Sequence, residues 1–294
     1  MLYLILCILS STGIFIVFKL IDRQAISPLP AILINYFTAS ILGFLAFDTD
    51  KPELGSLLSL PWIPISILIG FLFIVMFFVV AISSKEAGLT ITTVASKISV
   101  VFPVLFSILI EPDDILTLLK GSALIAAVAG VFLTIYTPGQ LSTQKNRWII
   151  PLILFVGMGI VDSLVKYAQH CFIANEDRAI FSAVLFAMAF LTGLLVLPFR
   201  RKQLKEFGKG KTWFFGILLG IVNFGSIFLL LSALNHVNSY GKHIDSSLIF
   251  GANNVGIVSL SVLAGLLLFK EKLHRINWLG IGISGAALLL FALA

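Results

Sequence analysis

The chain has few charged residues and almost no cysteine for its length. Only 12% of its 294 residues are Asp, Glu, Lys or Arg, whereas 59% are hydrophobic. Soluble domains carry roughly 25% charged residues. The two cysteines, Cys7 and Cys171, lie in apolar runs and are interpreted as packing residues rather than as a disulfide framework. A chain so poor in charge cannot cover itself with a water-soluble surface, so the composition predicts an integral membrane protein.

The sequence also lacks the residue patterns that mark most enzymes and cofactor sites. It has no Ser/His/Asp arrangement and no HExxH motif, and its four histidines show no metal-ligand spacing. Gly210-Lys211-Thr212 resembles the end of a phosphate-binding P-loop, but Lys205 stands where the first glycine should be. We therefore expect no enzyme activity, no bound metal and no cofactor.

Long apolar segments are what the sequence does contain. There are ten of them, and most approach the roughly 20 residues that a membrane-spanning helix needs. They cover residues 1–20, 31–47, 62–83, 89–110, 115–136, 148–171, 179–198, 212–234, 244–269 and 277–294. The expected fold is all-α, with ten transmembrane helices in a multi-pass protein of the plasma (inner) membrane.

The ten segments divide into two copies of a five-helix unit, residues 1–140 and 146–294. Three pairs of positions mark the repeat: Lys19 with Lys166, Ala39-x-x-x-Gly43 with Ala189-x-x-x-Gly193, and Glu111 with Glu271. Because each unit has an odd number of helices, the two copies must cross the membrane in opposite senses. The sequence therefore predicts an inverted-topology repeat.

Loop charges predict the orientation in the membrane. Thirteen basic residues follow the odd-numbered segments: Arg23, Lys85, Lys145, Arg147, Arg200, Arg201, Lys202, Lys205, Lys209, Lys211, Lys270, Lys272 and Arg275. The opposite loops hold Lys51, Arg178 and Lys242. Basic loops stay in the cytoplasm, so both termini are predicted to be extracytoplasmic. The same clustering explains the net charge of +6 without nucleic acid as a partner.

Several features together resemble the drug/metabolite transporter superfamily, and within it the EamA-like branch. They are the five-plus-five helices, the glutamates that close the fourth and ninth segments (Glu111, Glu271), Pro103 in the fourth, and glycines in the fifth and tenth (Gly130, Gly282, Gly285). The resemblance covers nearly the whole chain. It implies a central cavity lined by helices 1, 3, 4, 6, 8 and 9. The family is usually drawn with cytoplasmic termini, and here the loop charges predict the reverse.

Lys97 is the leading candidate for a substrate contact. It lies well inside the fourth segment, on a polar stripe with Thr90 and Thr93, where a lysine costs roughly 2.5–3.5 kcal/mol on insertion scales. Such a charge should face a cavity or a partner. The functional interpretation is a point charge for a carboxylate or phosphate; the alternative is a structural ion pair with an acidic neighbour.

Asp162 and Lys166 stand four residues apart in the sixth segment, in the order that favours a helical ion pair. They are either a structural pair or a coupling site in which Asp162 carries a proton. Further polar side chains on the presumed cavity helices are predicted to bind substrate: Thr12, Thr93, Asn223, Asn253 and Asn254. Asn35 lies outside that set and is predicted to join helices. Pro103 is the candidate hinge, since it bends the fourth helix.

These observations predict a secondary transporter that moves a small polar metabolite by alternating access. The metabolite would bear a carboxylate or a phosphate, and a proton or ion is a candidate coupling partner. The expected partners are the lipid bilayer and the small-molecule substrate, with the protein a monomer or homodimer. The alternative function is a flippase of the same fold for a lipid or lipid-linked head group, because Lys97 would suit its phosphate equally well.

Overall fold

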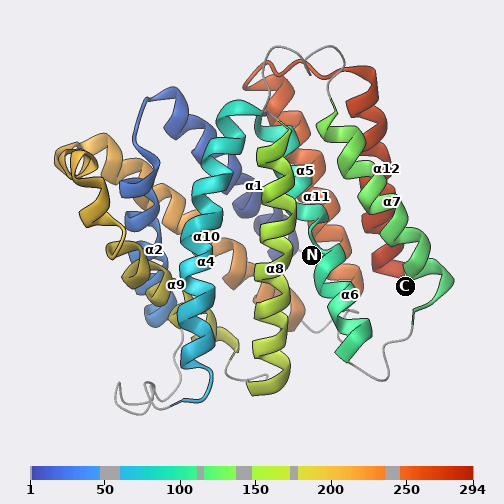
Figure 1. Ribbon diagram of the computed structural model, residues 1–294, viewed down its shortest axis with the longest axis horizontal. Helices are drawn as coiled ribbons and strands as arrows, with labels where there is room; N and C mark the ends of the chain where they lie inside the picture. The colour runs from blue at the N-terminus through green and yellow to red at the C-terminus, as the bar shows by residue number, and fades with distance from the viewer. Residues whose placement is uncertain are drawn as a thin grey trace.

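The computed structural model describes residues 2–46, 60–110, 116–136, 148–172, 178–235 and 246–293, and within these ranges every regular element is a helix (Figure 1). The first half of the chain contains α1 (Leu2–Arg23), α2 (Pro28–Ala46), α4 (Ile63–Glu86), α5 (Leu89–Ile98), α6 (Val101–Ile110) and α7 (Leu118–Ile135). The second half contains α8 (Ile149–Phe172), α9 (Arg178–Leu194), the 3₁₀ helix η2 (Leu197–Gly208), α10 (Gly210–Asn235), α11 (Ser246–Leu267) and α12 (Arg275–Leu293). Glu111, Lys51, Lys145, Arg147 and Lys242, on which parts of the repeat and charge arguments depend, lie outside the described residues.

Helix length and composition show an all-α membrane protein, as the sequence predicts. Seven of the described helical segments are long and apolar enough to cross a membrane, and three shorter apolar helices accompany them. Large apolar side chains also point outward along the bundle. Leu45, Leu109 and Ile125 are 70%, 83% and 74% exposed. Outward faces of this kind suit a hydrocarbon solvent and would be unusual in water.

The fourth apolar segment is not the single helix that the sequence predicts. It forms α5 and α6, separated by a turn at Ser99 and Val100. Pro103 explains the position of this break, because it has no N–H to donate to the carbonyl of Ser99 and its ring would clash with that carbonyl in a continuous helix. The Ser99 carbonyl accepts instead from the N–H of Phe102 at 2.9 Å. The break lies about halfway along the bundle (Figure 1).

Helix α5 is enclosed by protein on almost every side. Its apolar residues Val94 and Ile98 are buried, and so are the hydroxyl residues along this segment: Thr90, Thr92, Thr93, Ser96 and Ser99. The helix packs against α11 on one side and α8 on the other, with further contacts to α1, α4, α7 and α12. The polar half of this segment therefore faces the interior of the bundle rather than lipid.

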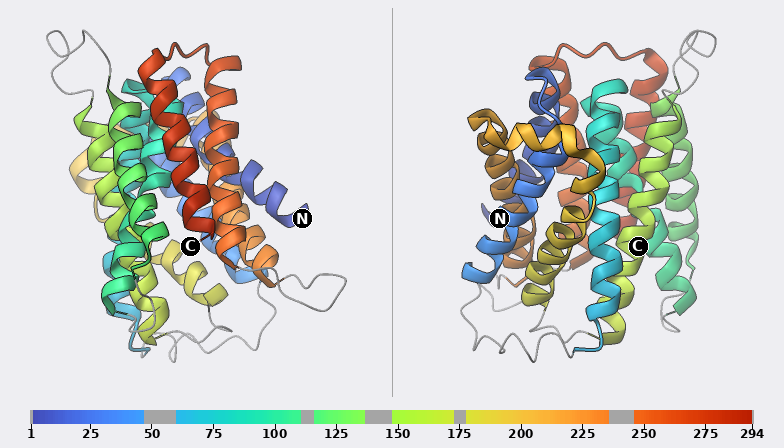
Figure 2. Two further views of the ribbon diagram at one scale, coloured as in Figure 1. Left: turned by 90° about the vertical axis from the view of Figure 1, so that its right-hand side faces the viewer. Right: turned by 60° about the vertical axis from the view of Figure 1, so that its left-hand side comes forward.

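The connections richest in basic residues gather at one end of the bundle. The α1–α2 connection, the α4–α5 turn and the α11–α12 connection lie at this end in Figure 2, and its right-hand view shows η2 toward the same end. The segment from Arg200 to Lys209, expected to be part of a loop, instead includes most of η2. The C-terminal end of α12 lies away from these connections (Figure 2). We refer to the end with these connections as the basic end.

Candidate functional site

Lys97 is the last residue but one of α5 and lies just before the break in the fourth segment. Its side chain is partly exposed although the helix around it is buried. Among the residues that the structure describes, its ammonium group makes no hydrogen bond and has no carboxylate oxygen within 4.0 Å. A cation without a direct partner inside a membrane protein is available to a ligand or to water.

Asp162 of α8 is an opposite charge that acts on Lys97 from beyond ion-pair distance. The two charged groups lie more than 4.0 Å apart, but close enough for their charges to influence one another. The carboxylate of Asp162 accepts from the hydroxyl of Ser99 at 3.2 Å, and the same hydroxyl lies 2.6 Å from the Ser96 carbonyl. Asp162 therefore contacts the turn between α5 and α6.

Cys7 connects this region with three further helices. Its sulfur lies 3.2 Å from Oδ1 of Asn253 on α11 and 3.2 Å from the carbonyl oxygen of Ser226 on α10. The Lys97 side chain lies near this thiol. We call Lys97, Asp162, Ser99, Cys7 and Asn253 the central polar cluster. It draws on α1, α5, α8 and α11 and on the turn that follows α5.

The remaining predicted site residues are less available to a ligand. The Thr93 hydroxyl donates to the Leu89 carbonyl at 2.9 Å within its own helix. Asn223 is paired with Asn35, and their amide groups lie 3.1 Å apart between α10 and α2. Asn35 thus joins helices as predicted, and Asn223 does the same.

Three further candidates complete the predicted set. Thr12 is buried with a hydroxyl that has no hydrogen-bond partner in the described structure. Asn254 is partly exposed, and Lys166 is also partly exposed and lies one helical turn beyond Asp162. Of the predicted site residues, the structure brings Lys97, Asp162 and Asn253 into one cluster. In the described part of the chain, no group of three His, Cys, Asp or Glu side chains could hold a metal ion.

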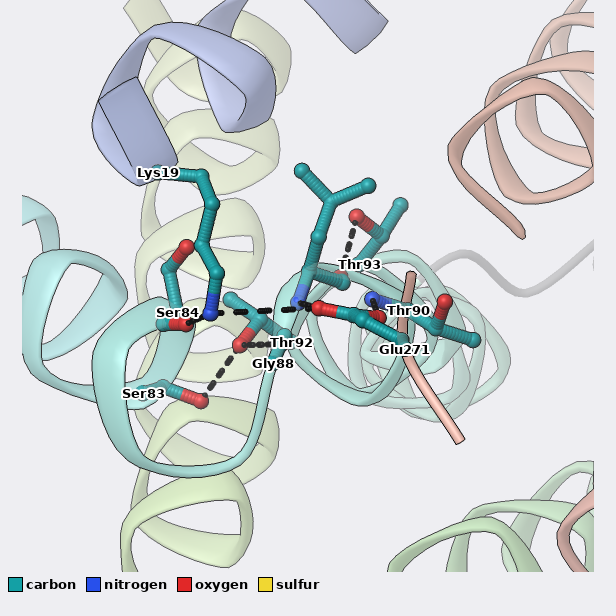
Figure 3. Close-up of polar contacts among 9 residues, drawn as sticks. Lys19, Ser83, Ser84, Gly88, Thr90, Thr92, Thr93 and Glu271 are labelled. Atoms are coloured by element: carbon teal, nitrogen blue, oxygen red, sulfur yellow. Dashed lines mark hydrogen bonds and ion pairs between the residues drawn. The ribbon is translucent and has the colours of Figure 1, made fainter. Parts of the chain in front are cut away.

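A second polar cluster lies at the basic end, around Glu271 in the α11–α12 connection (Figure 3). Its carboxylate accepts from the first two backbone N–H groups of α5, at 2.5 Å from Leu89 and 3.1 Å from Thr90. These N–H groups have no acceptor within the helix because they lie in its first turn, and negative charge is favoured there. A residue of the second half of the chain therefore caps a helix of the first half.

Lys19 completes this second cluster from the end of α1. Its ammonium donates to the carbonyl of Ser84 at 2.6 Å and lies 3.9 Å from Oε1 of Glu271 (Figure 3). Both charged side chains are largely buried, at 15% and 13% exposed. We call Lys19, Ser84, Gly88, Thr90 and Glu271 the end cluster. It joins α1, α4, α5 and the α11–α12 connection.

Gly88 explains why the cap comes from so far away in the sequence. It precedes α5 with φ = 94°, a conformation that suits glycine, and it has no side chain with which to cap the helix. A Cβ at this position would lie 2.6 Å from Oε1 of Glu271. In the sequence, Lys19 and Glu271 marked the repeat, and Glu271 also supported the family resemblance, but nothing there predicted their contact. Because Gly88 has no side chain to cap α5, the sequence did indicate that the first N–H groups of this helix need an acceptor from elsewhere.

Comparison with known proteins adds relatives but no function. No protein-family model matches the chain. An uncharacterized protein of Haemophilus influenzae (strain ATCC 51907 / DSM 11121 / KW20 / Rd) is 28% identical over 296 residues, which cover 97% of this chain and 95% of that protein. A protein of known crystal structure, 14% identical, aligns over 97% of both chains with a TM-score of 0.56. At that identity, the structural similarity concerns the fold alone.

Proposed function

We propose that the protein is a secondary transporter of the plasma membrane that moves a small polar metabolite bearing a carboxylate or phosphate. The observation that carries this proposal is Lys97, a partly exposed cation in the bundle interior without a direct ion-pair partner among the described residues. Asp162 beside it and the amide of Asn253 on the facing helix supply an acceptor and a hydrogen-bonding group. A small, enclosed set of charged and polar groups of this kind suits a small polar ligand.

The pattern of helix contacts supports a two-fold internal repeat, and five helices in each unit would make that repeat an inverted one. A half-turn that exchanges residues 1–140 with residues 146–294 would convert the α2–α10 pair into α9–α4, and the α1–α10 pair into α8–α4. All four pairs pack together, and the pairs α7–α12, α5–α11 and α2–α9, which the half-turn maps onto themselves, also pack together. The proposed architecture is accordingly ten helices in the arrangement of the drug/metabolite transporter superfamily, with the central polar cluster between the halves.

The end cluster supports a conformation closed at the basic end. It ties α1, α4 and α5 to the α11–α12 connection through Lys19 and Glu271. α1 also packs against α4 and α5, whereas the described residues of α8 show no equivalent packing against α10 and α11. In alternating access, the two halves would rock about the central polar cluster, and these contacts would break when the basic end opens.

Thermal-shift screening of the purified protein in detergent tests the proposed substrate class. A compound present at 100 times its Kd should raise the free energy of unfolding of the wild type by about 2.7 kcal/mol. We expect compounds with a carboxylate or phosphate to give this shift, and we expect the shift to disappear in Lys97→Met. A screen in which only lipids stabilise the protein would favour the flippase. Shifts that persist in Lys97→Met would remove Lys97 from the site.

The orientation is a separate prediction, and it rests on the basic end. Because basic connections remain in the cytoplasm, the opposite end of the bundle, toward which α12 runs, should face outward. A reporter fused after Ala294 should therefore be active as an extracytoplasmic fusion. A cytoplasmic reporter signal would restore the orientation usually drawn for the superfamily.

A further inference from the structure

We propose that the N-terminus of α5 and Lys19 form a carboxylate-binding site, which Glu271 fills while the basic end is closed and a substrate carboxylate fills when Glu271 withdraws. The first part concerns the closed protein alone. The second part rests on the transport function proposed above. The site is distinct from the central polar cluster, since it lies at the start of α5 and Lys97 lies near its end.

The N-terminus of α5 binds the Glu271 carboxylate in a bidentate manner. Oε1 of Glu271 accepts from Leu89 N–H and Oε2 accepts from Thr90 N–H, so each oxygen has its own backbone donor. Lys19 adds a positive charge 3.9 Å from Oε1. Charge-assisted bonds of this kind are about twice as strong as neutral ones, and the helix dipole adds to them.

One donor of the site is not used by Glu271. The hydroxyl of Thr90 is fully buried and has no hydrogen-bond partner in the described structure. It lies beside the carboxylate, because a Cβ built on Gly265 would lie 2.5 Å from the Thr90 hydroxyl and 2.7 Å from Oε2 of Glu271. A buried hydroxyl left without a partner is costly, and a free carboxylate positioned slightly differently from Glu271 would satisfy it.

Glu271 is attached to the half of the chain that must move. Its backbone N–H bonds to the carbonyl of Gly265 at 2.9 Å, so the carboxylate is carried by the end of α11. Separation of the halves at the basic end would draw it away from α5, leaving two N–H groups without their acceptor and Lys19 without its ion-pair partner. A substrate carboxylate has the same charge and shape. By binding there it would favour the open state, which is how a ligand shifts a two-state equilibrium.

Removal of the Glu271 carboxylate should expose this site to a small anion. We would purify full-length Glu271→Ala in detergent and measure Tm in sodium acetate and in sodium chloride at equal ionic strength. The variant should melt below the wild type, and acetate should raise its Tm saturably by about 2 °C or more. The wild type should show no such rise, because Glu271 already fills the site. Adding Lys19→Met to Glu271→Ala should reduce the acetate effect.

Glu86→Ala is the matched control, since Glu86 is an exposed carboxylate at the same end of the bundle. A folded Glu271→Ala protein without an acetate response, or an equal response in Glu86→Ala, would overturn the proposal. If Glu271→Ala is not monodisperse, Glu271→Gln takes its place in the experiment. Acetate should raise the Tm of Glu271→Gln by a smaller amount, and the absence of any rise would contradict the proposal. If acetate stabilises Glu271→Ala but the wild type transports no compound, the carboxylate site is supported and the transport function is contradicted. If the wild type transports but acetate does not stabilise Glu271→Ala, the transport function is supported and the carboxylate site is contradicted.

Discussion

Lys97→Met should abolish transport while leaving expression and monodispersity in detergent close to those of the wild type. Methionine keeps much of the length of the side chain and removes a charge that has no direct ion-pair partner in the described structure. If the ammonium neutralises an anionic substrate group, its loss removes substrate binding rather than folding. Uptake into proteoliposomes measures the effect, with Lys85→Met, an exposed lysine at the basic end, as the control.

Asp162 determines how the Lys97 result is interpreted. Should Lys97 serve mainly to balance the nearby carboxylate, Lys97→Met would be destabilised and Asp162→Asn in the same chain would restore its stability. A double-mutant cycle of melting temperatures measures this coupling. Full transport by Lys97→Met would eliminate both the substrate role and the ion-pair role.

Gly280→Leu should prevent the normal packing of α12, whereas Gly282→Leu should be tolerated. A Cβ at Gly280 would overlap α7, with the Leu133 carbonyl carbon at 2.7 Å and the Thr134 hydroxyl at 2.5 Å. A Cβ at Gly282, two residues along the same helix, meets nothing within 4 Å. The two positions share their helix and their residue type, so the comparison isolates helix contact.

Alanine gives the graded form of the same experiment. Gly280→Ala should cost roughly 1–3 kcal/mol through overpacking, and Gly282→Ala should be neutral or stabilising by up to about 1 kcal/mol through helix propensity. Yield of monodisperse protein and Tm report the difference. Equal behaviour of the two alanine variants would contradict the close approach of α7 and α12.

The membrane character of the chain could be predicted because long apolar segments are a local property of sequence. The buried polar face of α5 was also predictable, since Thr93 and Lys97 recur at helical spacing within an apolar run. The position of the break was not. Pro103 affects the carbonyl four residues earlier, so the helix ends near Ser99 and the proline itself lies inside α6. Whether this break acts as a hinge stays a prediction.

The other features that the sequence did not predict depend on contacts between residues far apart in the chain. Glu271 caps α5 from the other half of the chain, and no local pattern indicates the partner of a carboxylate after α11. Asn223 looked like Asn253 in sequence, since both are amides in apolar segments. The fold pairs Asn223 with Asn35 and places Asn253 beside Cys7. Which amide is available to a ligand depends on helix packing, and only the structure separates them.

Counterflow in proteoliposomes tests the central claim most directly. Vesicles containing the purified protein are loaded with an unlabelled compound that shifts its Tm, and then diluted into a trace of the labelled compound without nucleotide. Alternating access predicts a transient accumulation of label above its equilibrium level, absent in vesicles made with Lys97→Met. Simple equilibration of the label without overshoot, or no entry of a compound that binds, would contradict the account.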